Sequence, residues 1–356
     1  MGWWATILAG YGLGYDFMHG ALWHGHEMLF GYTVAVLSGF LATGTRGTRL
    51  VALATIWVAG RLVVAASPVL PAWLVAVIDV AYLPALALLR IPSLWKTIKW
   101  PTIGFVPLLA ALTASNILFH LGQLGLVPDG AELGLGLAVD LFTLMMIVIA
   151  GRLVPGYTRA MRIPLRLPKD PIRERVSVAL MVLAVTADLL QQSTASGVLF
   201  ALVAAVQLRR LIGWQNARLR RHPHLWVLHV GFAWLVIGLA LRASAALIGV
   251  PSAADALHGI TAGAIGILTL GMMTRLSRIH ARRSIAPSAC TWISYGAVLG
   301  SGLARVIGPV IMPENTQSIL LAAAGLWIAA FALFLAEYAP MLVSPPQAER
   351  ETSSTP

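Results

Sequence analysis

Charged residues are scarce in this chain of 356 residues, because Asp, Glu, Lys and Arg together make up 11 % of it while hydrophobic residues make up 58 %. About a quarter of the residues of a soluble domain are charged, so the composition excludes an ordinary soluble protein. A mean hydropathy of +0.80 and repeated apolar runs indicate an integral membrane protein. The one cysteine, Cys290, excludes an internal disulfide.

Lysine and arginine are also absent from every second segment between the apolar runs. The intervening segments are basic and include the long stretch 155–174. The positive-inside rule places the basic segments in the cytoplasm, so orientation explains the net charge of +11 and we expect no nucleic-acid partner. The segments without Lys or Arg are 16–24, 67–71, 123–132, 192–196, 248–254 and 309–316.

Apolar runs bounded by Pro, Gly and charged residues predict an all-α fold, a polytopic transmembrane helix bundle of about 12 spans with both termini cytoplasmic. We expect one transmembrane domain over 1–343 and a disordered cytoplasmic tail over 344–356, which is rich in Pro, Ser and Thr. The first helix is short for a span. The predicted helices are 1–15, 25–45, 50–66, 72–90, 101–122, 133–154, 175–191, 197–211, 224–247, 255–275, 288–308 and 317–343.

Ionisable side chains within the predicted spans gather toward the non-cytoplasmic ends of the helices. Charge inside a span is costly and usually marks a functional site. Structural Arg–Asp pairs between helices would satisfy such residues equally well, without any function. The residues in this set are Arg61, Arg242, Arg305, Glu27, Asp79, Asp140, Asp188, Asp255, His24, His26, His120 and His258.

Histidines at similar depth on several helices tip the balance toward a bound cofactor, because imidazole is the usual protein ligand of haem iron, copper and zinc. His26 and His258 are the first candidates for haem ligands, and His120 is the next. His24 is a further candidate, and with His26 it could take part in a copper site. His229 lies in the inner half of its span, where it either takes part in cofactor binding or hydrogen-bonds a neighbour.

Three arginines at the same depth favour haem over a bare ion, because guanidinium groups bind carboxylates bidentately and haem carries two propionates. We expect these roles for Arg61, Arg242 and Arg305. The predicted polar site also includes Glu27, Asp79 and Asp140.

The stretches that follow His26 and His258 share a glycine pattern, with glycines five and thirteen residues after each histidine. Glycines on one stripe let helices pack closely, and they would also let a flat macrocycle approach. Close helix packing is the more common use. The glycines are Gly31 and Gly39 after His26, and Gly263 and Gly271 after His258.

Several motifs resemble those of the NnrS family, bacterial membrane proteins linked to nitric oxide and described as containing haem and copper. The resemblance implies a twelve-helix bundle in the bacterial inner membrane that protects against nitrosative stress, with nitric oxide as ligand. The polar positions that match the family are His24, His26, Glu27, His120, His229, His258 and His280. The motifs are WHGHEMLFG (23–31), GFLATG (39–44), WVAGRL (57–62), GRLVPGYTR (151–159), RHPHLWVLHVGFAWL (221–235) and ALHGITAGAIGILTLGMMTRLSRIHARR (256–283).

The sequence departs from the family pattern in two cytoplasmic segments. Thr45–Thr48 replaces a Pro-Asn-Trp-Thr-Gly type turn, and Ile279–Arg283 replaces Gly-His-Thr-Gly-Arg. Both departures put cytoplasmic contacts in doubt more than a site at the opposite side.

Three classes of function remain open. The first is a haem-binding protein that binds or helps to detoxify nitric oxide, and the sequence does not determine whether it catalyses a reaction. The second is a membrane redox protein that transfers electrons through haem, with copper as a second candidate cofactor; the absence of a His-His pair and of a His-Pro-Glu motif argues against the haem–copper oxidases. The third is a secondary transporter, which intramembrane acids would fit.

Overall fold

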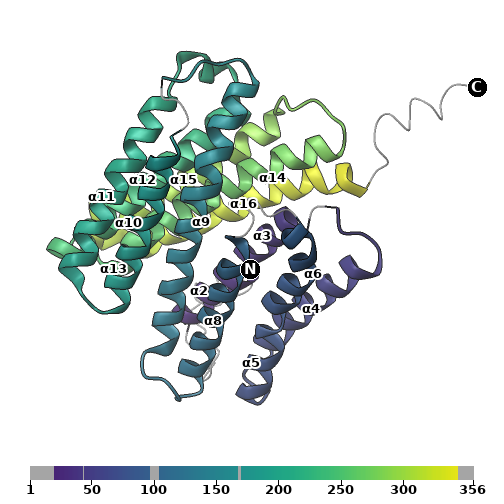
Figure 1. Ribbon diagram of the computed structural model, residues 1–356, viewed down its shortest axis with the longest axis vertical. Helices are drawn as coiled ribbons and strands as arrows, with labels where there is room; N and C mark the ends of the chain where they lie inside the picture. The colour runs from purple at the N-terminus through teal and green to yellow at the C-terminus, as the bar shows by residue number, and fades with distance from the viewer. Residues whose placement is uncertain (1–19, 43, 97–103, 167–169, 344–356) are drawn as a thin grey trace, which may run out of the picture. The chain divides into compact units, whose positions relative to one another are not determined.

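The computed structural model describes residues 20–42, 44–96, 104–166 and 170–343, and these residues form helices joined by turns, without a β-strand among them (Figure 1). The predicted all-α fold is confirmed. The expected first helix, 1–15, and the expected tail, 344–356, lie outside the described residues.

The helices fall into two compact units, residues 1–142 and 143–356. Helix α9 begins in the first unit and continues in the second. The first unit contains α2 (Gly20–His26), η1 (Glu27–Thr33), α3 (Val34–Leu41), α4 (Thr48–Ala65), α5 (Ala72–Val80), α6 (Tyr82–Lys96), α8 (Phe105–Gln123) and the start of α9 (Gly130–Ala160). The second contains α10 (Pro171–Leu189), α11 (Ser193–Trp214), η2 (Ala217–Arg221), α12 (Pro223–Ile248), α13 (Ala253–His258), η3 (Gly259–Ile265), α14 (Gly266–His280), α15 (Ala289–Ile311), η4 (Pro313–Asn315) and α16 (Thr316–Val343).

Nine helices within the described ranges are long and apolar enough to cross a membrane, which confirms a multi-pass membrane protein. Two further predicted spans are helical as well, the continuous stretch 20–41 and α10. The nine are Thr48–Ala65, Ala72–Arg90, Phe105–Gln123, Gly130–Ala160, Ser193–Trp214, Pro223–Ile248, Ala253–His280, Ala289–Ile311 and Pro313–Val343.

The start of α10 shows how local sequence sets a helix boundary. The carboxylate of Asp170 accepts hydrogen bonds from the backbone N–H groups of Ile172 at 3.0 Å and Arg173 at 3.2 Å. Pro171 occupies the first helical position, where no N–H donor is needed. The helix therefore starts four residues before the predicted residue 175, because its first turn carries charged residues that the apolar run does not include.

Helix α9 continues to Ala160, past its predicted end at residue 154, although Pro155 lies inside it. Proline has no N–H, so the carbonyl oxygen of Gly151 loses its usual partner four residues on. Arg210 of α11 replaces that partner: its Nη2 donates to the Gly151 oxygen at 2.9 Å, and its Nη1 donates to the Ile147 oxygen at 3.2 Å. A Cβ on Gly151 would lie 2.1 Å from Arg210 Nη2, so this position requires glycine.

Two of the spans contain a π-helical segment of seven residues, η1 and η3. Each begins directly after a histidine, His26 at the end of α2 and His258 at the end of α13. A π-helix widens the backbone turn and is frequent at functional sites. The hydroxyl of Thr33 in η1 also donates to the carbonyl oxygen of Met28 at 2.7 Å, five residues earlier. The sequence predicted uninterrupted helices here, and the widened turns correct that prediction.

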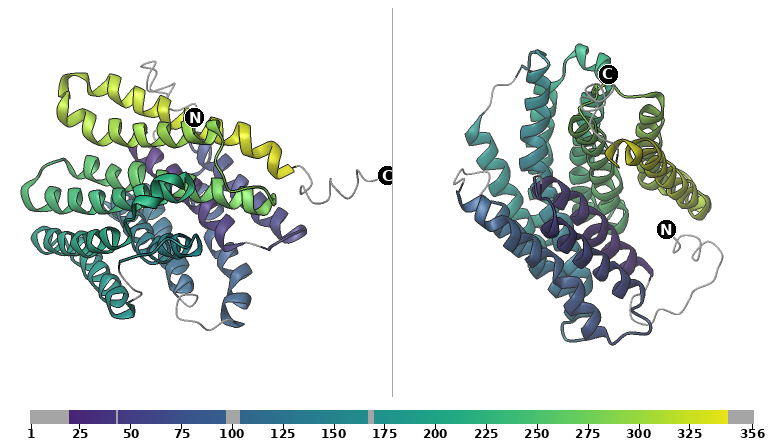
Figure 2. Two further views of the ribbon diagram at one scale, coloured as in Figure 1. Left: turned by 90° about the horizontal axis from the view of Figure 1, so that it is seen from above. Right: turned by 90° about the vertical axis from the view of Figure 1, so that its right-hand side faces the viewer.

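In the second unit, α15 and α16 lie side by side along most of their length (Figures 1 and 2). Two serines of α15 hydrogen-bond to backbone oxygens of α16, Ser294 to Ala330 at 2.7 Å and Ser301 to Ala323 at 2.8 Å. Hydrogen bonds between helices stabilise packing in a bilayer, where apolar contact alone gives little preference over lipid.

Candidate metal centre

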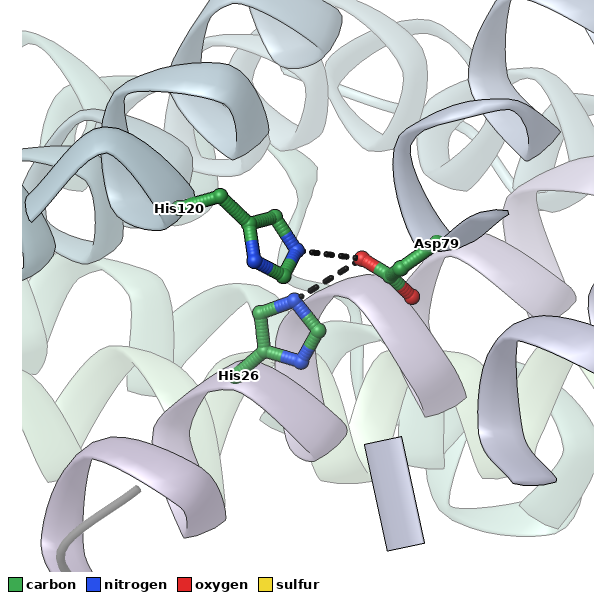
Figure 3. A group of neighbouring side chains, drawn as sticks. All are labelled: His26, Asp79 and His120. Carbon is green, nitrogen blue, oxygen red and sulfur yellow. Dashed lines mark hydrogen bonds and ion pairs between the residues drawn. The ribbon is translucent and has the colours of Figure 1, made fainter. Parts of the chain in front are cut away.

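Three polar side chains from separate helices of the first unit point toward one another (Figure 3). His26 ends α2, Asp79 lies near the end of α5, and His120 lies in the last turn of α8. One ligand atom of each lies within 4.8 Å of the others. The three residues are buried, with 0 % of His26 and 2 % of Asp79 and of His120 exposed. Imidazole and carboxylate groups at this spacing form a donor set that can hold a metal ion.

The carboxylate of Asp79 is the centre of this cluster. Its Oδ2 lies 3.1 Å from His26 Nε2 and 3.0 Å from His120 Nε2, and it accepts a hydrogen bond from Asn116 Nδ2 at 2.9 Å. Its Oδ1 accepts from Arg61 Nη2 in an ion pair. A buried carboxylate is stable only with such partners, because it has lost its hydration.

The imidazole of His26 faces oxygen atoms on both sides. Its Nδ1 lies 3.3 Å from Glu27 Oε1, and its Nε2 lies 3.1 Å from both Asp79 Oδ2 and Asn116 Oδ1. A neutral imidazole has one N–H, and its other nitrogen is an acceptor that repels a neighbouring acceptor oxygen. The contacts are satisfied when Nδ1–H donates to Glu27 and a cation, either a proton or a metal ion, occupies Nε2. Histidines that bind metals commonly donate their other N–H to a carboxylate in this way.

Arg61 of α4 joins the two acids of this region through ion pairs with Glu27 and Asp79. Two glycines leave room for the side chains of these ion pairs. A Cβ on Gly31 would lie 3.0 Å from Arg61 Nη1, and a Cβ on Gly60 would lie 3.3 Å from Asp79 Oδ1. Two carboxylates and one guanidinium leave one uncompensated negative charge, which a cation bound between the imidazoles would neutralise.

Aromatic rings line the cluster beside His26. The ring centroids of Phe119 and Phe30 lie 4.6 Å and 5.1 Å from that of His26, and Phe119 is fully buried. Apolar rings exclude water, so charges here interact more strongly than at a surface. His120 Nδ1 is buried without a hydrogen-bond partner, which leaves Nε2 as the nitrogen of that ring that makes polar contacts.

Asn116 is the member of the cluster that sequence reasoning did not include. It lies four residues before His120 on α8, so both side chains are on one face of the helix. That spacing was the available signal. An amide in a span is less conspicuous than a charge, and its role depends on contacts with α2 and α5.

The other predicted residues of the first unit are His24 and Asp140. His24 lies two residues before His26 on α2 and is half-buried. Asp140 is buried on α9. The predicted roles of both residues stay predictions.

The predicted histidines of the second unit hydrogen-bond within that unit. His258 donates from Nδ1 to the carbonyl oxygen of Ala254 at 2.6 Å. His229 Nε2 lies 3.0 Å from Thr158 Oγ1, whose own hydrogen bond goes to the Val154 oxygen, so Nε2 is the donor. His229 Nδ1 lies 3.5 Å from Gln215 Nε2, a donor. In contrast to His26, a neutral His229 satisfies every one of these contacts.

The two predicted arginines of the second unit form ion pairs with protein carboxylates. Arg242 donates to Asp188 at 2.9 Å and lies 4.1 Å from the ring centroid of Phe200, while Arg305 donates to Asp255 at 2.8 Å. These are the structural Arg–Asp pairs that the sequence left open as an alternative to haem propionates.

Comparison with known protein families gives one match. The family model described as NnrS protein matches residues 1–345, nearly the whole chain. Searches of curated proteins and of solved structures found no match. The coverage agrees with the motifs of the spans, from the His26 segment to the His258 segment. The chain therefore belongs to the NnrS family.

Proposed function

We propose that this protein is a metal-binding membrane protein of the bacterial nitric oxide response, and that His26, Asp79 and His120 hold the metal. Family membership supports the nitric oxide response. The observation that carries the metal site is the His26 imidazole, which has acceptor oxygens at both nitrogens and needs a cation at Nε2. A second imidazole, that of His120, directs its Nε2 to the same carboxylate oxygen.

The donor set and a role in binding nitric oxide together favour iron or copper. Two imidazoles and one carboxylate are the ligands of many non-haem iron(II) sites, and the same groups suit copper(II) and zinc. Iron and copper bind nitric oxide, whereas zinc has no redox chemistry to offer it. A bound ion would supply a coordination position for nitric oxide, while Glu27 and Arg61 orient His26 and Asp79.

Haem is the cofactor that the sequence resemblance implies, and this cluster does not fit a haem held between its two imidazoles. Asp79 Oδ2 lies within 3.1 Å of both Nε2 atoms, in the space that the porphyrin ring would need. Both Nη atoms of Arg61, which would bind a propionate bidentately, already form ion pairs with Glu27 and Asp79. We therefore assign a bare ion to the cluster, and we keep His258 as the predicted ligand of a haem.

We further propose a twelve-span topology in the bacterial inner membrane with both termini in the cytoplasm. Nine candidate spans, the helical stretch 20–41, α10 and the expected segment 1–15 would supply the twelve crossings. The alternation of basic and uncharged connections supports the orientation. In this topology the His26 cluster lies toward the periplasmic ends of its helices.

The test is the metal content of protein purified from membranes without chelators, measured for iron, copper and zinc by elemental analysis. We expect about one equivalent of iron or copper per chain in the wild type. His26→Gln should lose this metal, whereas His229→Gln, the matched change at a satisfied buried histidine, should keep it. Electron paramagnetic resonance after adding nitric oxide should change in the wild type and stay unchanged in His26→Gln.

Wild-type protein that contains no iron or copper, even after incubation with each ion, would contradict the metal site and leave a proton as the cation on His26. A transporter with a protonated His26 would give that result. The absorption spectrum of the same samples tests haem separately: a Soret band that disappears in His258→Ala supports the predicted ligand, and a wild type without the band contradicts haem binding.

A further inference from the structure

Arg275 of α14 is a buried cation that forms no ion pair with a carboxylate among the described residues. It is 6 % exposed, and its guanidinium carbon lies 4.1 Å from the ring centroid of Tyr157. Two of its nitrogen atoms, Nε and Nη1, are buried and make no hydrogen bond with any residue that the structure describes. Leaving donors of a charged group unsatisfied costs more than leaving neutral donors unsatisfied, so this arrangement points to an absent acceptor.

His224 lies opposite Arg275 across the α12–α14 interface. A Cβ on Gly271 of α14 would lie 3.0 Å from side-chain atoms of Val227 and Leu228 on α12, so the two helices are in contact there. The helices run in opposite directions. One turn before Val227 is His224, and one turn after Gly271 is Arg275, so these two residues face the same part of the interface. His224 is 8 % exposed, and neither of its ring nitrogens has a hydrogen-bond partner within the described ranges. Two unsatisfied polar side chains therefore meet at one position in the second unit.

Five of the six acidic residues described in the second unit form ion pairs with arginines other than Arg275. Arg278, one turn after Arg275, forms an ion pair with Glu337 at 2.5 Å. Glu314 lies in η4, between α15 and α16. The remaining pairs are Asp170 with Arg173, Glu174 with Arg152, Asp188 with Arg242 and Asp255 with Arg305.

Arg210, another buried arginine of this unit, shows how a guanidinium can be satisfied without a carboxylate. Its guanidinium donates to the backbone oxygens of Ile147 and Gly151 and to Gln207 Oε1 at 2.7 Å. Arg275 has no such set of acceptors at Nε and Nη1. The contrast indicates that no described residue supplies acceptors for Nε and Nη1 of Arg275.

We propose that Arg275 and His224 bind a phosphate group. A guanidinium presents parallel N–H donors that match phosphate oxygens, and an imidazole adds one more donor. His224 lies in the first turn of α12, a helix of 26 residues, where the helix dipole also favours an anion. Three exposed arginines of η2 precede this turn and would attract anions to it: Arg218, Arg220 and Arg221.

The phosphate can come from an anionic phospholipid headgroup or from free inorganic phosphate. Basic sites between membrane helices bind anionic headgroups by the same contacts. The site uses residues of the second unit alone, so it stands or fails independently of the metal proposed in the first unit.

The experiment compares purified wild type, Arg275→Gln and Arg283→Gln in nanodiscs of phosphatidylcholine with and without phosphatidylglycerol. Arg283 is an exposed arginine just after α14, so its change removes the same charge without touching the site. Native mass spectrometry counts the phosphatidylglycerol that remains bound, and thermal unfolding measures the stabilisation. We expect Arg275→Gln to weaken retention about tenfold or more, as loss of charged hydrogen bonds predicts, and Arg283→Gln to match the wild type.

A second arm adds inorganic phosphate to detergent-solubilised protein. Stabilisation of the wild type by phosphatidylglycerol alone assigns the site to a lipid, and stabilisation by inorganic phosphate assigns it to the free ion; either supports the proposal if Arg275→Gln abolishes it. Arg275→Lys guards against a folding defect, because it keeps the charge and should retain part of the effect. Absence of both effects in the wild type, or equal loss in Arg275→Gln and Arg283→Gln, would overturn the proposal.

Discussion

His26 in the first unit and His258 in the second stand at the same place in two similar backbones. Each ends a short α-helix and is followed by a π-helix of seven residues, with a glycine five residues on. Their surroundings differ. His26 is fully buried beside Glu27, Asp79 and Asn116, whereas His258 is only partly buried and bonds to a backbone oxygen of its own helix.

The comparison separates local structure from chemistry. The widened turn and its glycine can be repeated without repeating a metal site, because the partners of His26 come from other helices. The arginines differ in the same way: Arg61 is shared by two acids at the cluster, while Arg305 makes a single pair with Asp255. Substitutions of corresponding residues in the two regions measure how far their contributions to stability and metal binding differ.

The largest effect is expected from Asp79→Ala. It leaves Arg61, His26 and His120 without their common buried acceptor, and removal of one partner from a buried ion pair typically costs about 3 to 5 kcal/mol. We expect a loss of this size in unfolding free energy, together with complete loss of bound metal. Denaturant unfolding in detergent micelles and elemental analysis measure the two.

The matched change in the second unit is Asp255→Ala, which removes a carboxylate that is 28 % exposed in its pair with Arg305. An exposed pair contributes about 1 kcal/mol or less. Equal losses of unfolding free energy in the two variants would show that Asp79 contributes no more to stability than a partly exposed ion pair does.

The next effect separates the two equivalent glycines. A Cβ on Gly263 would lie 2.4 Å from Trp234 Cε3, against a rigid ring, so Gly263→Ala should cost about 1 to 3 kcal/mol through overpacking. A Cβ on Gly31 would meet the flexible end of Arg61 at 3.0 Å, so Gly31→Ala should destabilise less but reduce metal content. Thermal unfolding and metal analysis distinguish these outcomes.

Gly296→Ala is the control for both glycine substitutions, because no heavy atom lies within 4 Å of the added Cβ. Alanine favours a helix over glycine by about 1 kcal/mol, so this variant should be as stable as the wild type or more so. If Gly31→Ala destabilises as much as Gly263→Ala, the packing around the two π-helices is more alike than the structure indicates.

The smallest effect is expected from Arg305→Gln. The pair with Asp255 is partly exposed, with 18 % of the Arg305 side chain accessible, so its loss should cost about 1 kcal/mol or less and leave the metal content unchanged. Arg61→Gln should lower the metal content by comparison. Loss of metal in Arg305→Gln would contradict the expectation that this ion pair does not affect metal binding.

The positions of the spans could be predicted because apolar runs and their flanking signals are local. The span predicted at 224–247 is α12, Pro223–Ile248, and its ends coincide with a proline and a glycine. Features set by distant residues could not be predicted. The passage of α9 through Pro155 depends on Arg210, and the π-helices after His26 and His258 replace expected regular turns.

The candidate site could be predicted only in part, for a geometric reason. Counting residues along a span gives depth in the membrane, but it gives neither the rotation of the helix nor its neighbours. Depth alone grouped His26, Asp79 and His120 with Arg242 and Arg305, and the structure pairs each of those arginines with an acid of the second unit. His26 and Asp79 are 53 residues apart, so their contact was beyond local inference.

Three residues at or beside α9 together complete the hydrogen bonding of its backbone. Pro155 offers no amide hydrogen, Gly151 has no side chain, and Arg210 brings more donors than its own helix can use. Replacing the proline alone would restore an amide that competes with the guanidinium, and enlarging the glycine alone would displace it. Evolutionary drift at these positions should therefore proceed jointly, so related chains that lose the proline should also have exchanged the arginine.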